Sequence, residues 1–513
     1  MMNSRTVIVY LGVVGVALMM RPAHGASCEE LAKLALPNTT ITLAEQVAAG
    51  TFKLPGNGAA GPAGPPAFGG MPAFCRVAGT IKPTSDSDIR FEVWMPAANW
   101  NGKFVGVGNG VWAGSISYGE MVAPLSGGYA TAATDDGHQG SPLDGNFVVG
   151  HPEKLIDFGH RAPHEMTVAA KATIAAFYSR KPDRALFVSC STGGRQALME
   201  AYRYPDDYDG ISSMAPANPM TQLMISSLWT GYAALKDAES RLPPPKLAVV
   251  KKAAVEACDA SDGVKDGIIG LPKACRFDPA VLQCKGGDAP DCLTAPQVTA
   301  LRAIYAGPKN PRTGKQIYPG FELGSEGMFP LQTGGPTPFP VATTYMSGLV
   351  LNDAKWDFKS FDYDRDTARA IKAGSAVLDV PPTGLDKFFA GNRKLLLSHG
   401  WADGLIPAQS TVDFYTALAR DLGARKADGG VRLFMVPGMG HCAGGDGPSS
   451  INVIAAIDQW VESGRAPERI IASNPPAAPA RTRPLCAYPQ VAKYSGTGSS
   501  DEEKNFNCVA PAR

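Results

Sequence analysis

The sequence predicts an α/β protein whose mostly parallel sheet is interrupted by a large inserted domain. An apolar strand at 184–189 is followed by a helical pattern at 193–201 and a second apolar strand at 211–215. Strand, helix and strand in this order form a βαβ unit of a parallel sheet. Buried-strand patterns then stop and return only at 393–400 and 431–436. The two ends of the chain are therefore expected to build one sheet, with a separate domain between them.

The domain boundaries follow from these changes of pattern. The middle region carries helical patterns, four cysteines and many prolines, which indicates a helical insertion. We expect four segments: a signal peptide at 1–25, a first sheet segment at 26–218, an inserted lid domain at 219–388, and a second sheet segment with a disulfide-tied tail at 389–513.

The first 25 residues have the pattern of a signal peptide. Arg5 precedes an apolar run from Val7 to Met20, and the small residues Ala23 and Gly25 suit cleavage near residue 25. A membrane anchor is the alternative, but the run is shorter than the roughly 20 residues that a spanning helix needs. The chain is therefore expected to be secreted or periplasmic.

Composition excludes two classes of partner. The 513 residues are 44% hydrophobic and 19% charged, and their net charge is +1. These values are ordinary for a globular protein. The chain has no basic stripe or acidic tail, so we expect neither nucleic acid nor an anionic membrane as a partner.

The N-terminal part is expected to contain a surface segment and two antiparallel strands. Residues 26–54 are expected to form a helix and a short strand-like segment at 41–43 that pack on the surface. A Gly- and Pro-rich stretch at 56–70 is typical of a mobile loop. Strands are predicted at 75–81 and 89–96, and the second alternates apolar and polar residues as a half-exposed strand does.

The next buried strand runs directly into a glycine-rich loop. Residues 104–108 are mostly apolar, and the chain continues as Asn-Gly-Val-Trp-Ala-Gly at 109–114. Such glycines permit a tight turn after a core strand. A further strand begins near residue 128 and ends in an Asp-Asp-Gly-His turn at 135–138. We interpret the acidic residues and the histidine of this turn as bracing groups rather than as catalytic ones.

The strand at 184–189 leads into a turn that predicts a nucleophile. In a nucleophile elbow the serine lies at the tip of a strand-to-helix turn, where small neighbours avoid clashes. The usual Gly-x-Ser-x-Gly pattern appears here with Ser189 in place of the first glycine, followed by Cys190, Ser191, Thr192 and Gly193. Ser191 is therefore the expected nucleophile. Cys190 is the alternative, but it lies on the strand side of the turn, and an exported thiol with a spare cysteine partner would oxidise.

The two later strands place an acid and a base at the same edge of the sheet. Asp403 follows the strand at 393–400, and His441 follows the strand at 431–436. Ser191, Asp403 and His441 thus occur in the chain order of an α/β-hydrolase triad, in which the histidine accepts the serine proton and the aspartate orients the histidine. Each of the last two alone could be an ordinary turn or loop residue. Their joint position at strand ends indicates catalysis.

An α/β-hydrolase also needs backbone N–H groups that stabilise the oxyanion of the reaction. Thr192 directly follows the nucleophile at a helix N-terminus, so its N–H is one expected donor. The glycine-rich loop is expected to supply the other, at Gly108 and Gly110. The alternative is that these glycines only permit the turn.

Ten cysteines follow the expected cleavage site. An even number in an exported chain predicts a disulfide framework, although spacing leaves its connectivity open. The chain has no CxxC pair, so metal binding by these thiols is not expected. Spacing favours the local pairs Cys258–Cys275, Cys284–Cys292 and Cys486–Cys508. Cys28–Cys75 would pin the N-terminal segment, which leaves Cys190 with Cys442, beside Ser191 and His441.

One loop of the insertion is rich in Asp and Gly and suits a bound cation. Asp259, Asp262 and Asp266 are spaced for an oxygen-rich Ca²⁺ loop, and the carbonyls of Val264 and Ile268 are further candidate ligands. The loop is not an EF-hand, because no Glu closes a twelve-residue loop. A solvated Asp/Gly turn is the alternative.

The chain resembles the tannase and feruloyl esterase family of exported α/β-hydrolases, which also includes a bacterial hydrolase of a terephthalate mono-ester. The resemblance covers nearly the whole chain after the signal peptide. It is carried by residues 106–114, 190–195, 259–268, 400–403 and 440–442.

The resemblance implies the triad and the five disulfides named above, of which the pair beside the serine and the histidine is distinctive. It also implies a structural Ca²⁺ in the lid and a lid that forms most of the pocket for an aromatic acid. The metal ligands that it implies are Asp259, Asp262, Val264, Asp266 and Ile268.

The predicted function is hydrolysis of small aromatic esters, those of hydroxycinnamic, gallic or related acids, through an acyl-enzyme. Hydrolysis of phthalate- or terephthalate-type mono-esters is the alternative, since these substrates share the triad. A peptidase or amidase and a non-catalytic binding module on the same fold are further alternatives. Trp356 is a candidate aromatic residue of the pocket or of the lid core.

Overall fold

The computed structural model describes residues 25–55 and 68–511. The expected signal peptide therefore lies outside the described residues except for its last position, and most of the expected loop at 56–70 also lies outside them. In the described part, no helix is long and apolar enough to cross a membrane.

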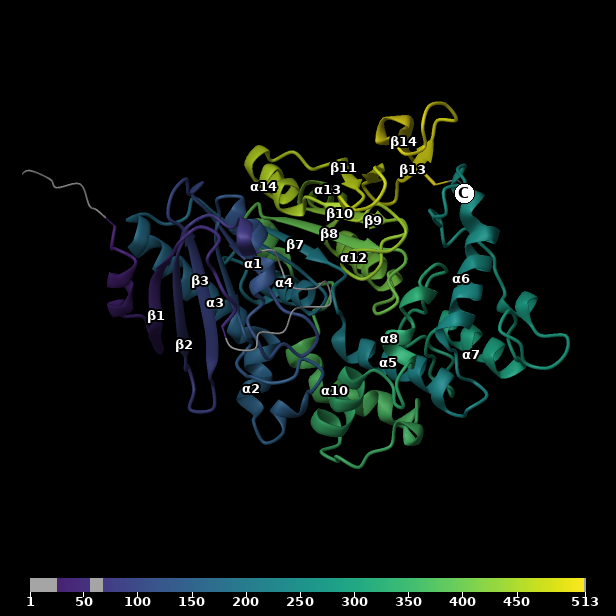
Figure 1. Cartoon of the computed structure of the whole chain (residues 1–513). Coiled ribbons are helices and arrows are strands. Elements are labelled where there is room, and N and C mark those ends of the chain that lie inside the picture. The colour runs from purple at the N-terminus through teal and green to yellow at the C-terminus, as the bar shows by residue number, and fades with distance from the viewer. Residues whose placement is uncertain (1–24, 56–67, 512–513) are drawn as a thin grey trace, which may run out of the picture.

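A large sheet runs through the molecule (Figure 1). Nine described strands hydrogen-bond in the order β1-β2-β3-β5-β4-β6-β7-β8-β9. Strands β1 to β3 pair antiparallel, as does β3 with β5, and every pair from β5 to β9 is parallel. The strands are β1 (Thr39–Val47), β2 (Phe74–Ile81), β3 (Ile89–Pro96), β4 (Lys103–Gly106), β5 (Ala130–Thr134), β6 (Arg184–Cys190), β7 (Gly210–Met214), β8 (Lys394–Gly400) and β9 (Val431–Val436). The prediction of a mostly parallel sheet is confirmed.

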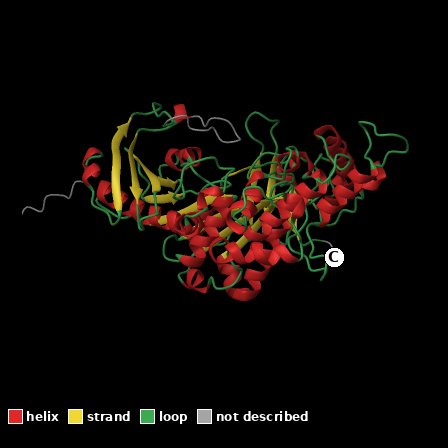
Figure 2. Ribbon diagram, turned by 90° about the horizontal axis from the view of Figure 1, so that it is seen from below, coloured by secondary structure: helices red, strands yellow, loops and turns green. Residues whose placement is uncertain are grey.

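The N-terminal segment has the two expected parts, with different lengths. The expected helix is a short 3₁₀ helix at Glu29–Lys33, and the expected strand-like segment at 41–43 lies within the longer edge strand β1. β1 pairs with β2 from Thr39 opposite Ile81 to Val47 opposite Phe74. Its polar composition arises because the strand lies at an edge and is largely open to solvent. The antiparallel strands form one end of the sheet in both overall views (Figure 1, Figure 2).

Helices cover both faces of the parallel strands. Helices α3, α4 and α12 share one apolar core with the sheet, and α1 and α14 share another. Adjacent strand residues alternate between these cores, as Leu395 and Leu397 face the first and Leu396 the second. The helices are α1 (Tyr118–Ser126), α2 (Pro152–Ile156), α3 (Ala162–Tyr178), α4 (Thr192–Arg203), α5 (Met220–Leu235), α6 (Pro244–Cys258), α7 (Ala295–Ala306), α8 (Pro330–Thr333), α9 (Pro340–Thr344), α10 (Arg365–Leu378), α11 (Asp386–Ala390), α12 (Gln409–Leu422), α13 (Ala424–Gly430) and α14 (Val453–Ser463).

Residues 215–393, here called the helical region, join β7 to β8 through helices, turns and isolated bridges. They appear in teal and green beside the sheet in Figure 1. Most of the buried apolar side chains of this region belong to a cluster that also includes Trp112 and Phe158 of the sheet segment. The helical region therefore has a core of its own and is anchored to the rest of the chain.

The C-terminal tail contains strands that the sequence patterns did not indicate. β10 (Ser450–Ile451), β11 (Arg469–Ser473) and β12 (Thr482–Cys486) form a small sheet, and β13 (Val491–Tyr494) pairs with β14 (Phe506–Val509). The disulfide between Cys486 and Cys508 joins β12 to β14. These strands are short and rich in polar and charged residues, so hydrophobic periodicity alone gives little signal for them.

Candidate active site

Ser191 lies at a strained turn between β6 and α4. Its backbone dihedrals are φ 64° and ψ −125°, a region that non-glycine residues rarely adopt. The N–H of Ser191 donates to the carbonyl of Met214 at 3.0 Å, and its own carbonyl accepts from the N–H of Arg195 at 3.0 Å. These bonds hold the strained residue between β7 and the first turn of α4, which is the geometry of a nucleophile elbow.

Packing around the elbow explains why a serine can replace the first glycine of the usual pattern. A Cβ atom at Gly193 would collide with the Ser189 hydroxyl, and one at Gly108 would crowd the same hydroxyl at 3.1 Å. A Cβ atom at Gly194 would collide with the carbonyl of Met214. Ser189 is therefore accommodated because the residues facing it are glycines.

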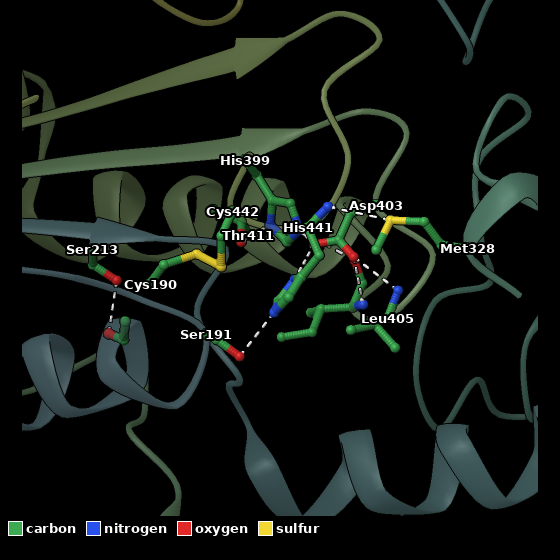
Figure 3. Close-up of a disulfide and its surroundings, with 12 residues drawn as sticks. Cys190, Ser191, Ser213, Met328, His399, Asp403, Leu405, Thr411, His441 and Cys442 are labelled. Atoms are coloured by element: carbon green, nitrogen blue, oxygen red, sulfur yellow. Dashed lines mark hydrogen bonds and ion pairs between the residues drawn. A yellow bond between two sulfur atoms is a disulfide. The ribbon is translucent and has the colours of Figure 1, made fainter. Parts of the chain in front are cut away.

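The three residues expected to form a triad lie in one hydrogen-bonded row (Figure 3). His441 Nε2 is 2.9 Å from Ser191 Oγ, and His441 Nδ1 is 2.7 Å from Asp403 Oδ2. A carboxylate only accepts hydrogen bonds, so Nδ1 carries the proton and Nε2 presents its lone pair to the serine hydroxyl. Asp403 is fully buried, whereas Ser191 and His441 are partly exposed. A substrate can therefore reach the serine and the histidine but not the aspartate.

Asp403 is held as a charged acceptor by four donors. The N–H groups of Leu405 and Ile406 donate to Oδ1 at 2.8 and 3.0 Å, while His441 and His399 contact Oδ2. Burial acts to raise the pKa of Asp403, yet the charges and hydrogen bonds of His441 and His399 hold this pKa well below its usual range. The carboxylate thus stays ionised and keeps His441 in the required tautomer.

His399 is a part of the site that the sequence patterns did not indicate. Its Nε2 lies 3.0 Å from Asp403 Oδ2 and 3.1 Å from the carbonyl of Ile406, and its Nδ1 lies 2.7 Å from Thr411 Oγ1. Both neighbours of Nε2 are acceptors, so this nitrogen carries the proton. The available signal was a histidine at the end of β8, four residues before the expected acid.

The structure contains the five expected disulfides. Cys190 and Cys442 are 252 residues apart in sequence, and their Cα atoms lie 5.9 Å apart. Because these cysteines directly precede Ser191 and follow His441, the bridge joins the nucleophile turn to the histidine loop (Figure 3). Bonded in this way, Cys190 has no free thiol and does not fit the role of nucleophile.

Replacing both Cys190 and Cys442 with Ser is expected to lower kcat by roughly 10- to 100-fold, because a shift of about 1 Å between catalytic groups has an effect of this size. The measurement is kcat together with the melting temperature by circular dichroism. The matched control replaces Cys486 and Cys508, a bridge between tail strands. Unfolding of the first variant with unchanged activity per folded molecule would show that the bridge is purely structural.

The glycine-rich loop after β4 is tied to the elbow by several hydrogen bonds. The N–H of Gly193 donates to the carbonyl of Asn109 at 2.7 Å, and the Thr192 hydroxyl donates to the carbonyl of Val111 at 2.7 Å. The N–H of Asn109 donates to Gln196 Oε1 at 3.0 Å. This network fixes the loop backbone beside Ser191.

The two glycines expected to line the oxyanion site lie in different surroundings. Gly108 is buried and packs against Gly193 and the Ser189 hydroxyl. Gly110 is exposed, and nothing lies within 4 Å of the position that its Cβ would take. Gly108 therefore lies in a closely packed position, and Gly110 borders open space.

The helical region contacts the loops that carry the triad. The N–H of His441 lies 3.3 Å from the sulfur of Met328 (Figure 3), and Gln332 Nε2 donates to the carbonyl of Gly404 at 2.8 Å. Trp112 of the glycine-rich loop donates to the carbonyl of Val341 at 3.1 Å. Met328 had no recognisable sequence signal, because only the packing of the helical region brings it to the histidine loop.

Trp356 packs within the helical region. It is partly buried, belongs to the rim of the apolar cluster there and meets Phe361 edge to face, with ring centroids 6.5 Å apart. These contacts favour the lid-core interpretation of this residue over the pocket interpretation.

The Asp- and Gly-rich loop after α6 has the donor chemistry of a calcium site. Gly263 and Gly267 have φ values of 95° and 81°, which a tight turn requires. Burial raises the pKa of Asp262 to about 6, and the neighbouring Asp266 and Asp259 carboxylates act in the same direction. Crowded carboxylates on one loop are the oxygen donors that Ca²⁺ prefers, so the residues fit this ion.

In two respects the loop is a less complete metal site than the sequence pattern suggests. Asp259, Asp262 and Asp266 are not among the described groups of acidic or histidine ligands whose atoms all converge within 4.8 Å. The Asp266 carboxylate is also paired with Arg483 of the tail. The carboxylates accept hydrogen bonds from loop N–H groups at 3.0–3.2 Å, among them the N–H of Val264 and that of Ile268.

Comparison with known proteins identifies the class to which this fold and site belong. A crystal structure of feruloyl esterase B from Aspergillus oryzae superposes with a TM-score of 0.87, at 29% identity, over 94% of this chain and 99% of that one. The fold and the site together define a carboxylic ester hydrolase of the α/β-hydrolase type.

The chain belongs to the tannase and feruloyl esterase family, whose model matches residues 75–509. It is 37% identical to an uncharacterized esterase of Xanthomonas campestris, over 99% of this chain and 95% of that protein. It is also 32% identical to the mono(2-hydroxyethyl) terephthalate hydrolase of Piscinibacter sakaiensis, over 86% of this chain and 85% of that protein.

Proposed function

We propose that the chain is an exported serine esterase that cleaves esters of aromatic acids through an acyl-enzyme. The observation that carries the proposal is the row of Ser191, His441 and Asp403, in which the unprotonated Nε2 faces the serine hydroxyl at 2.9 Å. Export is supported by five disulfides and by the absence of free cysteines among the described residues.

The reaction follows from the positions of these groups. Ser191 Oγ attacks the ester carbonyl carbon while His441 Nε2 takes the hydroxyl proton, and the carbonyl oxygen becomes an oxyanion. His441 then gives this proton to the leaving alcohol as the C–O bond breaks, which leaves an acyl-serine. In the second half, His441 Nε2 takes a proton from water while the water oxygen attacks the acyl carbon. His441 then gives this proton to Ser191 Oγ as the bond to the serine breaks, and the free acid departs. Asp403 stabilises the charged imidazole in both halves of the reaction.

The oxyanion is proposed to bind two backbone N–H groups. Thr192 lies at the N-terminus of α4, where helix N–H groups favour a negative charge. Gly110 is the proposed second donor, because it borders open space on a loop that hydrogen bonds fix beside the elbow. Gly108, which packs against Gly193, is proposed to act by permitting this close approach.

The substrate class rests on the relatives. One is named a probable feruloyl esterase B-2, from Aspergillus terreus, and another is named for hydrolysis of a terephthalate mono-ester. Both names describe esters of aromatic acids. We propose hydroxycinnamic, gallic or related acyl groups as the substrate, and terephthalate-type mono-esters as the second candidate. The helical region is proposed to cover the acyl group as a lid, since it contacts the triad loops through Met328 and Gln332.

A panel of small esters tests this function by kcat/KM. Methyl ferulate, methyl gallate and chlorogenate are expected to exceed a matched aliphatic methyl ester by at least about tenfold, a ratio that one hydrophobic pocket readily supplies. Preference for the terephthalate mono-ester would support the second candidate. Preference for an aliphatic ester or an anilide would contradict the proposed substrate class. Failure of a fluorophosphonate probe to label the protein would support the binding-module alternative.

A structural Ca²⁺ is proposed for the loop at 259–268, with Asp259, Asp262, Asp266 and the carbonyls of Val264 and Ile268 as its ligands. When bound, the ion would offset the charges of the crowded carboxylates and tie the loop together. None of the proposed ligands hydrogen-bonds to Ser191, Asp403 or His441 in the described structure, so the proposed role of the ion is stability.

Removal of calcium by EGTA is expected to lower the melting temperature by roughly 2–3 °C, the effect of losing an ion held at about 100 times its Kd in a chain of this size. The measurement is thermal unfolding with EGTA, then with Ca²⁺ or Mg²⁺ restored; only Ca²⁺ should recover the loss. Asp262→Asn should abolish the response to EGTA. Asp237→Asn is the control, because that residue lies outside the loop. An unchanged melting temperature would favour the solvated-turn interpretation.

A further inference from the structure

A second group of ligand-type side chains lies outside the triad and the calcium loop. It consists of His164 on α3, Glu200 on α4 and Asp207 in the turn between α4 and β7. One candidate ligand atom from each lies within 4.8 Å of the other two, and no other group of three or more His, Cys, Asp or Glu in the described chain is arranged in this way. The elements that meet here include the helix whose N-terminus carries Ser191.

Two of the three side chains are already joined. His164 Nδ1 lies 2.6 Å from Asp207 Oδ2. The imidazole of His164 stacks on the ring of Tyr204, with centroids 3.9 Å apart and planes 7° apart, and the Tyr204 hydroxyl is in turn 2.7 Å from His160 Nδ1. The plane of the His164 ring is therefore set by packing, as it is in metal sites whose ligands are held in place by neighbours.

Glu200 supplies an independent observation. Its side chain is buried, with 1% exposure, and its Oε2 has no hydrogen-bond partner. The nearby ammonium group of Lys171 donates to the backbone carbonyl of Asp207 instead. A buried carboxyl oxygen that receives no N–H or O–H donor calls for a bound group or for a proton shared with the neighbouring Asp207 carboxyl.

We propose that His164, Glu200 and Asp207 form a structural site for a divalent transition metal of the Zn²⁺ type. One imidazole nitrogen and two carboxylate oxygens are a common donor set for this ion, whereas Ca²⁺ and Mg²⁺ favour oxygen ligands alone. The ion takes the place of the proton between His164 and Asp207, and this proton is released to solvent. Glu200 is the third ligand. Water completes the shell.

The surroundings allow an ion to enter and give it a structural effect. The side chains of His164 and Asp207 are 28% and 14% exposed, so the rim of the site reaches solvent while Glu200 forms its floor. A bound ion would join α3, α4 and the turn before β7 at one point. The inference does not depend on the proposed esterase activity, because none of these groups contacts Ser191, His441 or Asp403 in the bonds described above.

The test is Zn²⁺ binding by calorimetry to metal-stripped protein in buffer with excess Ca²⁺, which keeps the calcium loop filled. We expect one equivalent per chain and a rise in melting temperature. His164→Ala should lose this equivalent, and Glu200→Gln should weaken binding at least about tenfold. His151→Ala is the matched control, since His151 also pairs with one carboxylate, that of Asp86, at 2.6 Å.

Co²⁺ in place of Zn²⁺ gives a second readout, because its visible absorption should appear with the native protein and the control and disappear with His164→Ala. Circular dichroism establishes that each variant is folded. Binding that persists in His164→Ala, or the absence of saturable binding to the native protein, would overturn the proposal. A third outcome would also overturn the proposal: Glu200→Gln is more stable than the metal-free native protein, and neither protein responds to Zn²⁺. The carboxyl groups of Glu200 and Asp207 would then share a proton instead of a metal ion.

Discussion

Ser191→Ala is expected to lower kcat/KM on an aromatic ester at least about 10⁴-fold while leaving the fold unchanged. The substitution removes the attacking oxygen but preserves the strained backbone, which is held by the bonds to Met214 and Arg195. The measurement is the initial rate of methyl ferulate or methyl gallate hydrolysis, with the melting temperature as a test of folding.

Ser463→Ala is a suitable control for this experiment, since Ser463 is an exposed residue at the end of α14. Its variant should match the native rate. Full activity in a purified Ser191→Ala protein would reject the serine mechanism, because the described structure places no other hydroxyl in the row with His441 and Asp403.

Asp403→Asn is expected to lower kcat by about 10³- to 10⁴-fold. The N–H groups of Leu405 and Ile406 both donate to Oδ1, so the amide oxygen takes that position. The amide NH₂ then faces His441 and donates to Nδ1, which forces the imidazole proton onto Nε2. A protonated Nε2 cannot accept the proton of Ser191.

Kinetics for this variant should show the loss in kcat with little change in KM, because the aspartate is buried and does not meet the substrate. Asp413→Asn is the control, since that residue is exposed on α12 and bonds only with Gln409 among the contacts described. An unchanged kcat in Asp403→Asn would mean that His441 is oriented by another group, and His399 would be the first to replace next.

The sequence patterns predicted the parts of the molecule in which local chemistry determines structure. Apolar runs such as 184–189 and 393–400 became buried parallel strands, because strands covered on both faces need apolar side chains along their whole length. Chain order and strand ends were enough to bring Ser191, Asp403 and His441 together, since the carboxyl ends of parallel strands share one edge of the sheet.

Other parts depend on partners distant in sequence. β1 is stabilised by pairing with β2, so its polar residues indicated only a short strand-like segment at 41–43. Met328 and His399 act through contacts that only the folded chain creates. The different surroundings of Gly108 and Gly110 likewise depend on the folded chain, and no spacing rule reveals them.

The bridge between Cys190 and Cys442 also makes the timing of activation depend on the compartment. A thiol pair 252 residues apart closes late, after the chain has folded far enough to bring the two loops together. In a reducing cytoplasm the pair stays open. A chain whose pair is still open would therefore hold its serine and histidine loops together by noncovalent contacts alone, and the roughly 10- to 100-fold gain in kcat expected of the bridge would come only after oxidation.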